Sequence, residues 1–248
     1  FNIQFLAQRN RVRVIECNLR ASRSFPFCSK VSRVNMIEMA VRAMLDEQVQ
    51  KAPASALDLD WVGVKAAQFS FSRLHGADPV SGVEMASTGE VGCIGAELND
   101  AFMKALLSVG YRIPKKRILL STGPIEDKLD FLDSARELVK MDYEIYASRG
   151  TAKFLAQNGV QTRSFNWPLE SREPNIASLI KNREVDMIIN IPKNNRETEL
   201  KNDYLIRRMA VDFDIPLFTN IKAARQFIDA LADFREKGLE IKAWEEYV

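Results

Sequence analysis

The 248-residue chain is poor in the residue types that build the commonest metal and disulfide sites. It has one histidine, His75, and three cysteines, Cys17, Cys28 and Cys93. Because the cysteines are odd in number and lack metal-ligand spacing, the sequence argues against a disulfide framework and against a zinc site. We expect three reduced thiols, as is usual in the cytoplasm.

Long apolar runs and a surplus of one charge are also missing. No run is long enough to cross a membrane, and we expect no cleaved leader. The 35 Lys and Arg are interleaved with 33 Asp and Glu, which gives a formal net charge of +2. Nucleic-acid surfaces need a local excess of basic residues, so the pattern predicts neither a nucleic-acid nor a membrane partner. A hydrophobic content of 46% is ordinary for one or two folded domains.

Near the N-terminus, polar residues follow an apolar run at regular spacing. In residues 12–18 alternate side chains project from one face of a strand, so Glu16, Asn18 and Arg20 are expected to line up. Another short apolar run precedes this one, and Arg9-Asn10 suits a hairpin turn between the two. Such a hairpin would bring Gln4 near Glu16.

This set of side chains suits a hard cation next to a phosphoryl group. Mg²⁺ is held by one or two carboxylates together with phosphate oxygens, and arginine offers a fork of donors to phosphate. The hypothesis is that Glu16 and Asn18 hold the metal while Arg20 and Arg23 hold phosphate. From the residues alone the alternative stays open, namely that they form the solvated face of a half-buried strand.

The middle of the chain is less regular. Residues 34–45 have helical spacing of apolar positions, and residues 61–71 and 82–95 look extended. Glycines in the second extended segment suggest turns or bulges. A helix is predicted over residues 99–109, with Asn99 as its N-cap and Gly110 as its end.

From Arg117 onward, short apolar strands alternate with amphipathic helices. This alternation predicts a parallel sheet with helices on both faces, which is a doubly wound α/β domain. The predicted strands are 118–121, 144–147, 160–165, 186–190 and 216–219, and the predicted helices are 128–141, 151–158, 175–181, 204–213 and 221–232.

Ligands of such domains gather beyond the carboxyl ends of the strands, where helix N-termini point. At one such end Ser148 and Thr151 offer two hydroxyls beside the exposed backbone of Gly150, which could cradle an anion. The alternative is that both hydroxyls only cap the helix. Arg207-Arg208 is a weaker anion clamp, because adjacent helical residues point about a third of a turn apart and at most one would face a site.

The N-terminal polar cluster lies in FNIQFLAQRNRVRVIECNLRASRSFPFCSK, which resembles the metal-binding and phosphate-binding end of the second ATP-grasp unit in carbamoyl-phosphate synthetase large chains. The resemblance continues through VGVKAAQFSFSRLHGADPVSGVEMASTGEVGCIG and FMKALLSVGYRIPKK, and then through a methylglyoxal-synthase-like regulatory domain. It implies an α/β fold in three parts. Residues 1–50 would end an ATP-grasp domain, residues 51–112 would be a connecting segment, and residues 113–248 would form the allosteric domain.

The resemblance also implies a function. The chain would be the C-terminal portion of a cytoplasmic ligase that phosphorylates carbamate with ATP and Mg²⁺ or Mn²⁺, in pyrimidine and arginine biosynthesis. Gln4, Glu16 and Asn18 would bind the metal, and Arg20 and Arg23 would be catalytic. A glutaminase small chain or domain would be the partner, and homo-oligomers are compatible with it. Since an upstream ATP-binding half is expected, the 248 residues alone should show no turnover.

Six residues are the expected effector site: Lys128, Ser148, Thr151, Trp167, Asn190 and Lys193. Trp167 stands where nucleotide-regulated members carry a phosphate-contacting lysine, and members that respond to N-acetylglutamate have Trp. An indole cannot pair with phosphate as an ammonium does, so the effector stays open. Ala66 replaces an acidic residue expected after the Lys of VGVK, which predicts weak or absent ornithine control.

Two other functions are alternatives. The chain could be an effector-binding module without catalysis. It could also be a lyase like methylglyoxal synthase, on fold alone, but fold does not carry function. That reaction would need an Asp/His pair in the second domain, whereas His75 lies in a loop of the first part.

Overall fold

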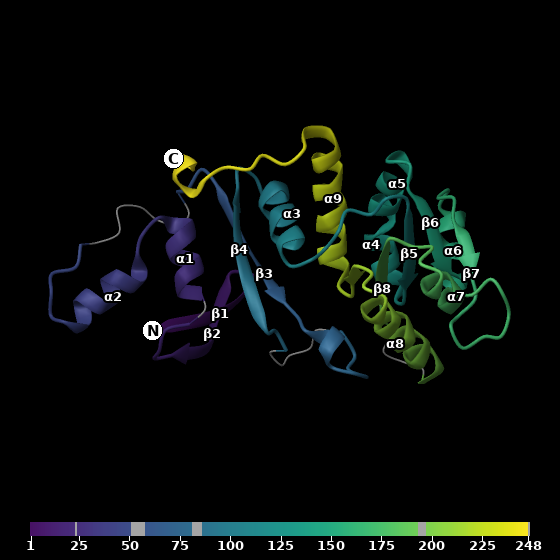
Figure 1. The fold of residues 1–248 in the computed structure, drawn as a ribbon, viewed down its shortest axis with the longest axis horizontal. Coiled ribbons are helices and arrows are strands. Elements are labelled where there is room, and N and C mark those ends of the chain that lie inside the picture. Colours follow the sequence, from purple (N-terminus) through teal and green to yellow (C-terminus); the bar gives the residue numbers. More distant parts are fainter. Residues whose placement is uncertain (23, 51–57, 81–85, 193–196, 248) are drawn as a thin grey trace.

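The computed structural model describes residues 1–22, 24–50, 58–80, 86–192 and 197–247 (Figure 1). The N-terminal ribbon and helices lie at one end, and a five-stranded α/β domain lies at the other. A β-hairpin with a helix against it lies between them. In the part of the chain described here, no helix combines the length and apolar character needed to span a bilayer.

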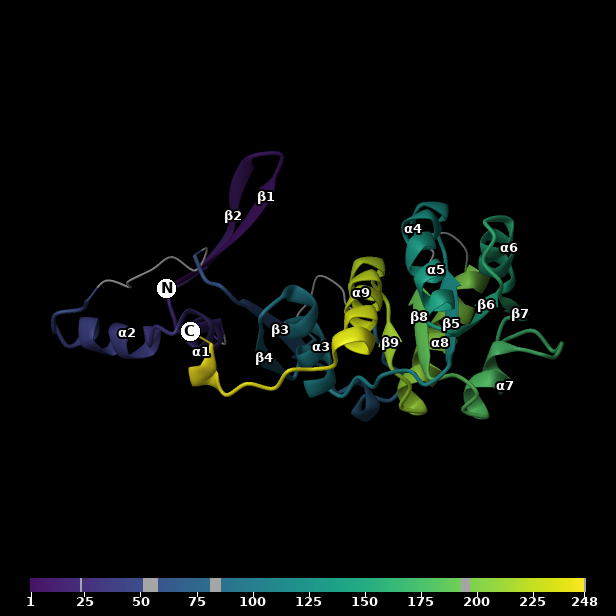
Figure 2. The same ribbon diagram turned by 90° about the horizontal axis from the view of Figure 1, so that it is seen from above.

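The predicted N-terminal hairpin is confirmed. Strands β1 (Asn2–Gln8) and β2 (Arg11–Asn18) pair antiparallel around Arg9 and Asn10, whose φ angles are 49° and 58°. Positive φ at both central positions is what a tight two-residue hairpin requires. The ribbon projects away from the rest of the molecule, as Figure 2 shows. Its apolar side chains are exposed, for example Phe5 at 57% and Val14 at 62%.

Two helices follow the ribbon. Helix α1 (Ser24–Ser32) was not among the predicted elements. Its first turn contains a proline, which is tolerated at that place in a helix. Helix α2 (Met36–Met44) confirms the predicted helix and begins after Asn35, whose side chain accepts a hydrogen bond from the Glu38 backbone N–H at 3.0 Å. This bond satisfies one of the unpaired donors at the start of the helix.

The prediction of turns or bulges at the β4 glycines is wrong. Strands β3 (Val62–Gln68) and β4 (Gly89–Gly95) pair in uninterrupted antiparallel register. Gly92 of β4 and Gly63 of β3 instead let helix α1 approach. A Cβ on Gly92 would lie 2.6 Å from a ring carbon of Phe27, and one on Gly63 would lie 2.4 Å from a methyl carbon of Val31. A short 3-10 turn, η1 (Phe71–Arg73), follows β3.

Helix α3 (Leu98–Ser108) confirms the predicted helix but not its cap. The N-cap is Glu97, and Asn99 lies inside the first turn. The Asn99 amide donates to Asp233 at 2.6 Å and its oxygen accepts from Gln226 at 2.5 Å, so it joins α3 to the last helix, α9. Gly110, at φ +94°, ends α3 as predicted.

The predicted doubly wound domain is confirmed. Five parallel strands lie in the order β7-β6-β5-β8-β9. Their bounds are β5 (Arg117–Thr122), β6 (Glu144–Ser148), β7 (Arg163–Phe165), β8 (Met187–Ile191) and β9 (Leu217–Phe218). The helices are α4 (Ile125–Asp130), α5 (Leu132–Lys140), α6 (Arg149–Gln157), α7 (Ile176–Lys181), α8 (Glu197–Asp212) and α9 (Ile221–Lys237). The single helix predicted over 128–141 is broken at Phe131, and α8 begins before the predicted residue 204.

The core lies on both faces of this sheet. Alternate residues of β5 divide between the faces: Ile118 and Leu120 pack with α5, α6 and α9, while Leu119 packs with α7 and α8. Buried parallel strands need apolar side chains on both faces, which is why the strand segments are almost wholly apolar. Successive strands are added to one side of β5 as far as β7, and then to its other side from β8 to β9. The carboxyl ends of β5 and β8 therefore lie at a topological switch point.

The C-terminal segment returns to the first half of the chain and ends in a 3-10 turn, η2 (Trp244–Glu246). The Trp244 indole donates to the Lys30 carbonyl at 2.8 Å, and the Tyr247 hydroxyl donates to the Ile94 carbonyl at 2.9 Å. Arg33 donates to the Tyr247 carbonyl at 2.7 Å. These bonds join the end of the chain to α1 and β4.

Candidate functional site

The N-terminal polar side chains lie together on the ribbon. Gln4 pairs with Glu16 across the two strands, and the Asn18 amide donates to Glu16 Oε1 at 2.9 Å. Paired residues share a face, so all three side chains present oxygen atoms to the same side. The register shifts after Gln4, and the next partner on that face is Arg13, which strict alternation from Glu16 would have placed on the other side.

The donor set is one carboxylate and two carboxamides. Among the described residues no group of three or more His, Cys, Asp or Glu is close enough to hold a metal ion. A single negative charge fits Mg²⁺ only when water and phosphate oxygens complete its octahedron, which is how Mg²⁺ is normally bound with nucleotides. Arg20 is exposed and donates to the Ala21 carbonyl at 3.2 Å, and Arg23 lies outside the described residues.

A second site lies beyond the carboxyl ends of β5 and β6. It is a small cavity of about 40 Å³. Its side chains come from four separate segments and are those of Ser121, Thr122, Lys128, Ser148, Thr151, Trp167 and Asp203. Four predicted effector residues therefore lie around one cavity at the place where α/β domains bind ligands.

Two hydroxyls organise the wall of this cavity. Thr151 Oγ1 accepts from the Thr122 backbone N–H at 3.1 Å and donates to the Thr122 carbonyl at 3.2 Å. Ser148 donates to Thr151 Oγ1 at 3.2 Å and, although it is the N-cap residue of α6, makes no capping bond with its side chain. The capping alternative therefore does not describe Ser148, whose side chain leaves the backbone donors in the first turn of α6 unoccupied.

Asn190 lies behind the cavity wall. It is fully buried at the end of β8, and its amide donates to Asp203 Oδ1 at 2.9 Å. It thus supports the cavity through Asp203 and does not line it. Lys193 lies outside the described residues.

Sequence reasoning missed three residues of this wall. Ser121 and Thr122 end an apolar strand, and the same carboxyl-end rule that selected Ser148 could have found them. Asp203 could not be found in that way, because it lies on α8 just before the residue at which that helix was predicted to begin.

Arg207 and Arg208 do not form an anion clamp. Both are buried and point to the segment Phe71–Asp78. Arg207 donates from Nε and Nη2 to the Asp78 carboxylate at 2.7 and 2.6 Å. Arg208 donates to Asp212 and to the carbonyls of Phe71, Leu74 and Ala77. The two guanidinium groups fasten residues 71–78 to α8 of the five-stranded domain.

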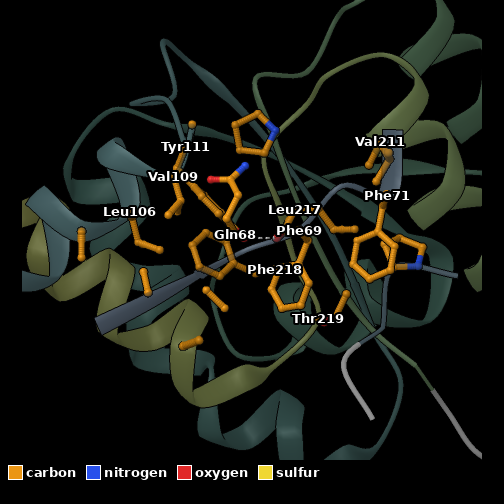
Figure 3. Close-up of a pocket in the computed structure, with 18 of the residues that line it drawn as sticks. Gln68, Phe69, Phe71, Leu106, Val109, Tyr111, Val211, Leu217, Phe218 and Thr219 are labelled. Atoms are coloured by element: carbon orange, nitrogen blue, oxygen red, sulfur yellow. Dashed lines mark hydrogen bonds between the residues drawn. The ribbon is translucent and has the colours of Figure 1, made fainter. Parts of the chain in front are cut away.

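A larger hollow of about 550 Å³ lies between β3, α3 and β9 (Figure 3). Its wall is mainly apolar, with Phe69, Leu106, Tyr111 and Leu217 among the residues that line it. Among the described lining residues the one acidic side chain is Asp214, which pairs with Arg112. A hollow of this kind lacks the free carboxylate that would hold an ammonium group.

The pKa of Tyr111 in this hollow is shifted. Its hydroxyl donates to the Leu217 carbonyl at 2.7 Å, and burial raises the pKa of Tyr111 to about 12. The neutral phenol is thus favoured in the folded chain. Ionisation of Tyr111 therefore does not change the free energy of unfolding below pH 10, and it lowers this free energy as the pH rises from 10 to 12. Tyr111→Phe should reduce this fall by up to about 1.4 kcal/mol per pH unit.

Urea unfolding at pH 8, 10 and 11 checks this expectation. The variant should be about 1 kcal/mol less stable than the wild type at pH 8, because one hydrogen bond is lost, and the gap should narrow at pH 11. A constant gap at all three pH values would show that Tyr111 does not set the alkaline slope.

Known proteins resemble the chain along most of its length. The MGS-like domain family matches residues 130–219, which run from the end of α4 through β9. Multifunctional protein pyrABCN of Emericella nidulans is 47% identical over 241 residues, which are 94% of this chain and 11% of that protein. The mitochondrial carbamoyl-phosphate synthase (ammonia) of Homo sapiens is 41% identical over 245 residues, which are 95% of this chain and 16% of that protein.

The solved methylglyoxal synthase of Elizabethkingia anophelis NUHP1 matches at 16% identity with a TM-score of 0.34, over 54% of this chain and 91% of that one. The chain spans only 11% and 16% of the two curated relatives above, so it corresponds to a limited region of each.

Proposed function

We propose that this chain, which is similar to carbamoyl-phosphate synthase over most of its length, corresponds to the C-terminal region of such an enzyme and joins two of its parts. The ribbon end would complete an ATP-grasp domain that phosphorylates carbamate. The five-stranded domain would bind a small effector that regulates the reaction.

In the catalytic part Gln4, Glu16 and Asn18 would hold Mg²⁺ or Mn²⁺, and Arg20 with Arg23 would pair with phosphoryl oxygens of ATP. The cation would neutralise charge that develops on the phosphoryl group. The residues of the chain position the donors in advance, since the 2.9 Å bond between Asn18 and Glu16 fixes both side chains on the same face.

The exposed ribbon supports its assignment to a larger domain. Phe5, Leu6, Val12, Val14 and Ile15 are each at least 57% exposed. Contiguous exposed apolar side chains of this kind usually mark a surface that another part of the protein covers. We propose that the rest of the ATP-grasp domain is that cover.

The observation that carries the regulatory role is the convergence of Lys128, Ser148, Thr151 and Trp167 on one cavity. A lysine, two hydroxyls and the N-terminus of α6 are suited to the anionic group of a small effector. Trp167 supplies an apolar wall to the rest of the ligand. The apolar hollow beside Ala66 supports weak or absent ornithine control.

Lys128→Gln should weaken binding of the anionic effector by about tenfold or more, because a charged hydrogen bond is lost. Thermal unfolding with UMP, IMP, N-acetylglutamate and ornithine measures this. A probe at about 100 times its dissociation constant stabilises the folded chain by roughly 2.7 kcal/mol. Ornithine, which is cationic at its side chain, should give no shift.

Lys153→Gln is the matched control, since Lys153 is exposed on α6 and is not among the residues that line the cavity. It should leave binding unchanged. If none of the anionic probes shifts the unfolding temperature, or if both variants weaken binding equally, the cavity is not the effector site.

The cytoplasm and a glutaminase partner remain proposals. The human relative is named as mitochondrial. His75 is exposed on the connecting segment and does not line the cavity, so the lyase alternative gains no support.

A further inference from the structure

The Arg207 guanidinium is a buried junction between two parts of the chain. It is 3% exposed, yet it pairs through two donors with Asp78, which comes 129 residues earlier. Its third donor, Nη1, reaches Asn190 Oδ1 at 2.8 Å. A bidentate pair fixes the relative orientation of both partners, because two parallel N–H···O bonds hold the planar fork against the carboxylate.

Asn190 continues this contact to the effector cavity. Its oxygen accepts from Arg207 and its amide donates to Asp203, whose carboxylate lines the cavity. Asn190 is fully buried, and its amide nitrogen also donates to the carbonyl of Ser121, which borders the cavity, at 3.4 Å. Both ends of the amide are therefore held by protein partners. A displacement of Asp203 would therefore turn Asn190 and deprive Arg207 of an acceptor.

The contacts that begin at the cavity end at residues 71–78, whose regular structure is the short 3-10 turn η1. Residues 71–78 lie against α8, held by Arg207 and Arg208 and by the Tyr204 hydroxyl, which donates to the Gly76 carbonyl at 2.8 Å. The segment follows β3 directly. Lys65 of β3 donates to Ser24 Oγ at 3.3 Å, at the start of the helix that follows the ribbon.

We propose that Arg207 is a positioning residue that couples occupancy of the effector cavity to the placement of the segment Phe71–Asp78. The route runs from Asp203 through Asn190 and Arg207 to Asp78, and from there along β3 toward the ribbon. This inference deepens the proposed function, since it rests on the cavity being the effector site.

Amide hydrogen exchange of the full chain without ligand tests the coupling. Asp78→Asn keeps the shape of the side chain but removes its charge, at a position outside the cavity. Exchange should become about fivefold faster or more within residues 71–78 and also within residues 121–128, which border the cavity. Asp78→Glu restores the charge and should recover part of the protection.

Asp212→Asn is the matched control, because Asp212 pairs with Arg208, which fastens the same segment without contacting Asn190. It should affect residues 71–78 alone. If Asp78→Asn leaves residues 121–128 unchanged, or if both variants loosen them equally, the coupling through Arg207 is wrong.

A second arm separates this inference from the proposed function. Wild-type chain is measured with UMP and with N-acetylglutamate at saturation. A probe that binds should slow exchange in residues 71–78, and binding without that change contradicts the coupling. If neither probe binds, the effector assignment fails, while the comparison of ligand-free variants still decides whether Arg207 links the two regions.

Discussion

Glu16→Gln in the full-length enzyme should lower kcat for ATP-dependent carbamoyl-phosphate formation by about 10²–10³-fold. The substitution keeps the size of the side chain and an oxygen that can still accept from Asn18, but it removes the only negative charge of the Gln4, Glu16 and Asn18 set. Without that charge the site depends on carboxamide oxygens, which attract Mg²⁺ weakly. Initial rates across a range of Mg²⁺ concentrations measure the loss.

Glu38→Gln is the matched control. Glu38 is a similarly exposed glutamate on α2, where it pairs with Arg42, and an exposed pair of this kind contributes little to stability. It should leave kcat unchanged. Near-normal kcat in Glu16→Gln, without a higher requirement for Mg²⁺, would remove the metal-binding role from the ribbon.

Phe227→Ala should lower the free energy of unfolding by about 3–5 kcal/mol. Phe227 of α9 is fully buried, and its ring lies 5.1 Å from that of Phe218 on β9. Its removal leaves a cavity where α9 covers the sheet, and α9 also packs against α3. Thermal unfolding should show a fall in Tm of roughly 10 °C for a chain of this size.

Leu129→Ala provides the comparison, because Leu129 is 57% exposed on α4 and should cost well under 1 kcal/mol. Equal small losses in both variants would mean that α9 is not fastened to the sheet through its buried face, and that the core has been placed wrongly.

Local patterns in the sequence were sufficient for most elements of the α/β domain. Buried parallel strands must be apolar and short, so each predicted strand from residue 118 onward corresponds to an observed one. Two short apolar runs separated by Arg9-Asn10 predicted the hairpin, and both residues take the positive φ that such a tight turn requires. The rule that ligands bind at the carboxyl ends of parallel strands then selected Ser148 and Thr151, and both residues line the cavity.

Long-range contacts decided what local patterns could not. Gly92 suggested a bulge by itself, and only the ring of Phe27 against it shows that it makes room for a helix. Asn99 is of a residue type that often caps helices, yet its side chain bonds to Asp233 and Gln226 on α9. In each case the deciding atom belongs to a residue far away in the sequence, about which neighbouring residues carry no information.

The sequence by itself determined the alternation of strands and helices from residue 117 onward and the spacing of the polar side chains, since both depend on backbone geometry over a few residues. Only the tertiary structure decided that Arg13 shares the face of Glu16, and that Arg207 faces Asp78 instead of a ligand. The physical reason for the first is that a bulge shifts the register of a strand. The reason for the second is that a buried charge must pair with an opposite charge, and the packing of the chain determines which one lies close enough.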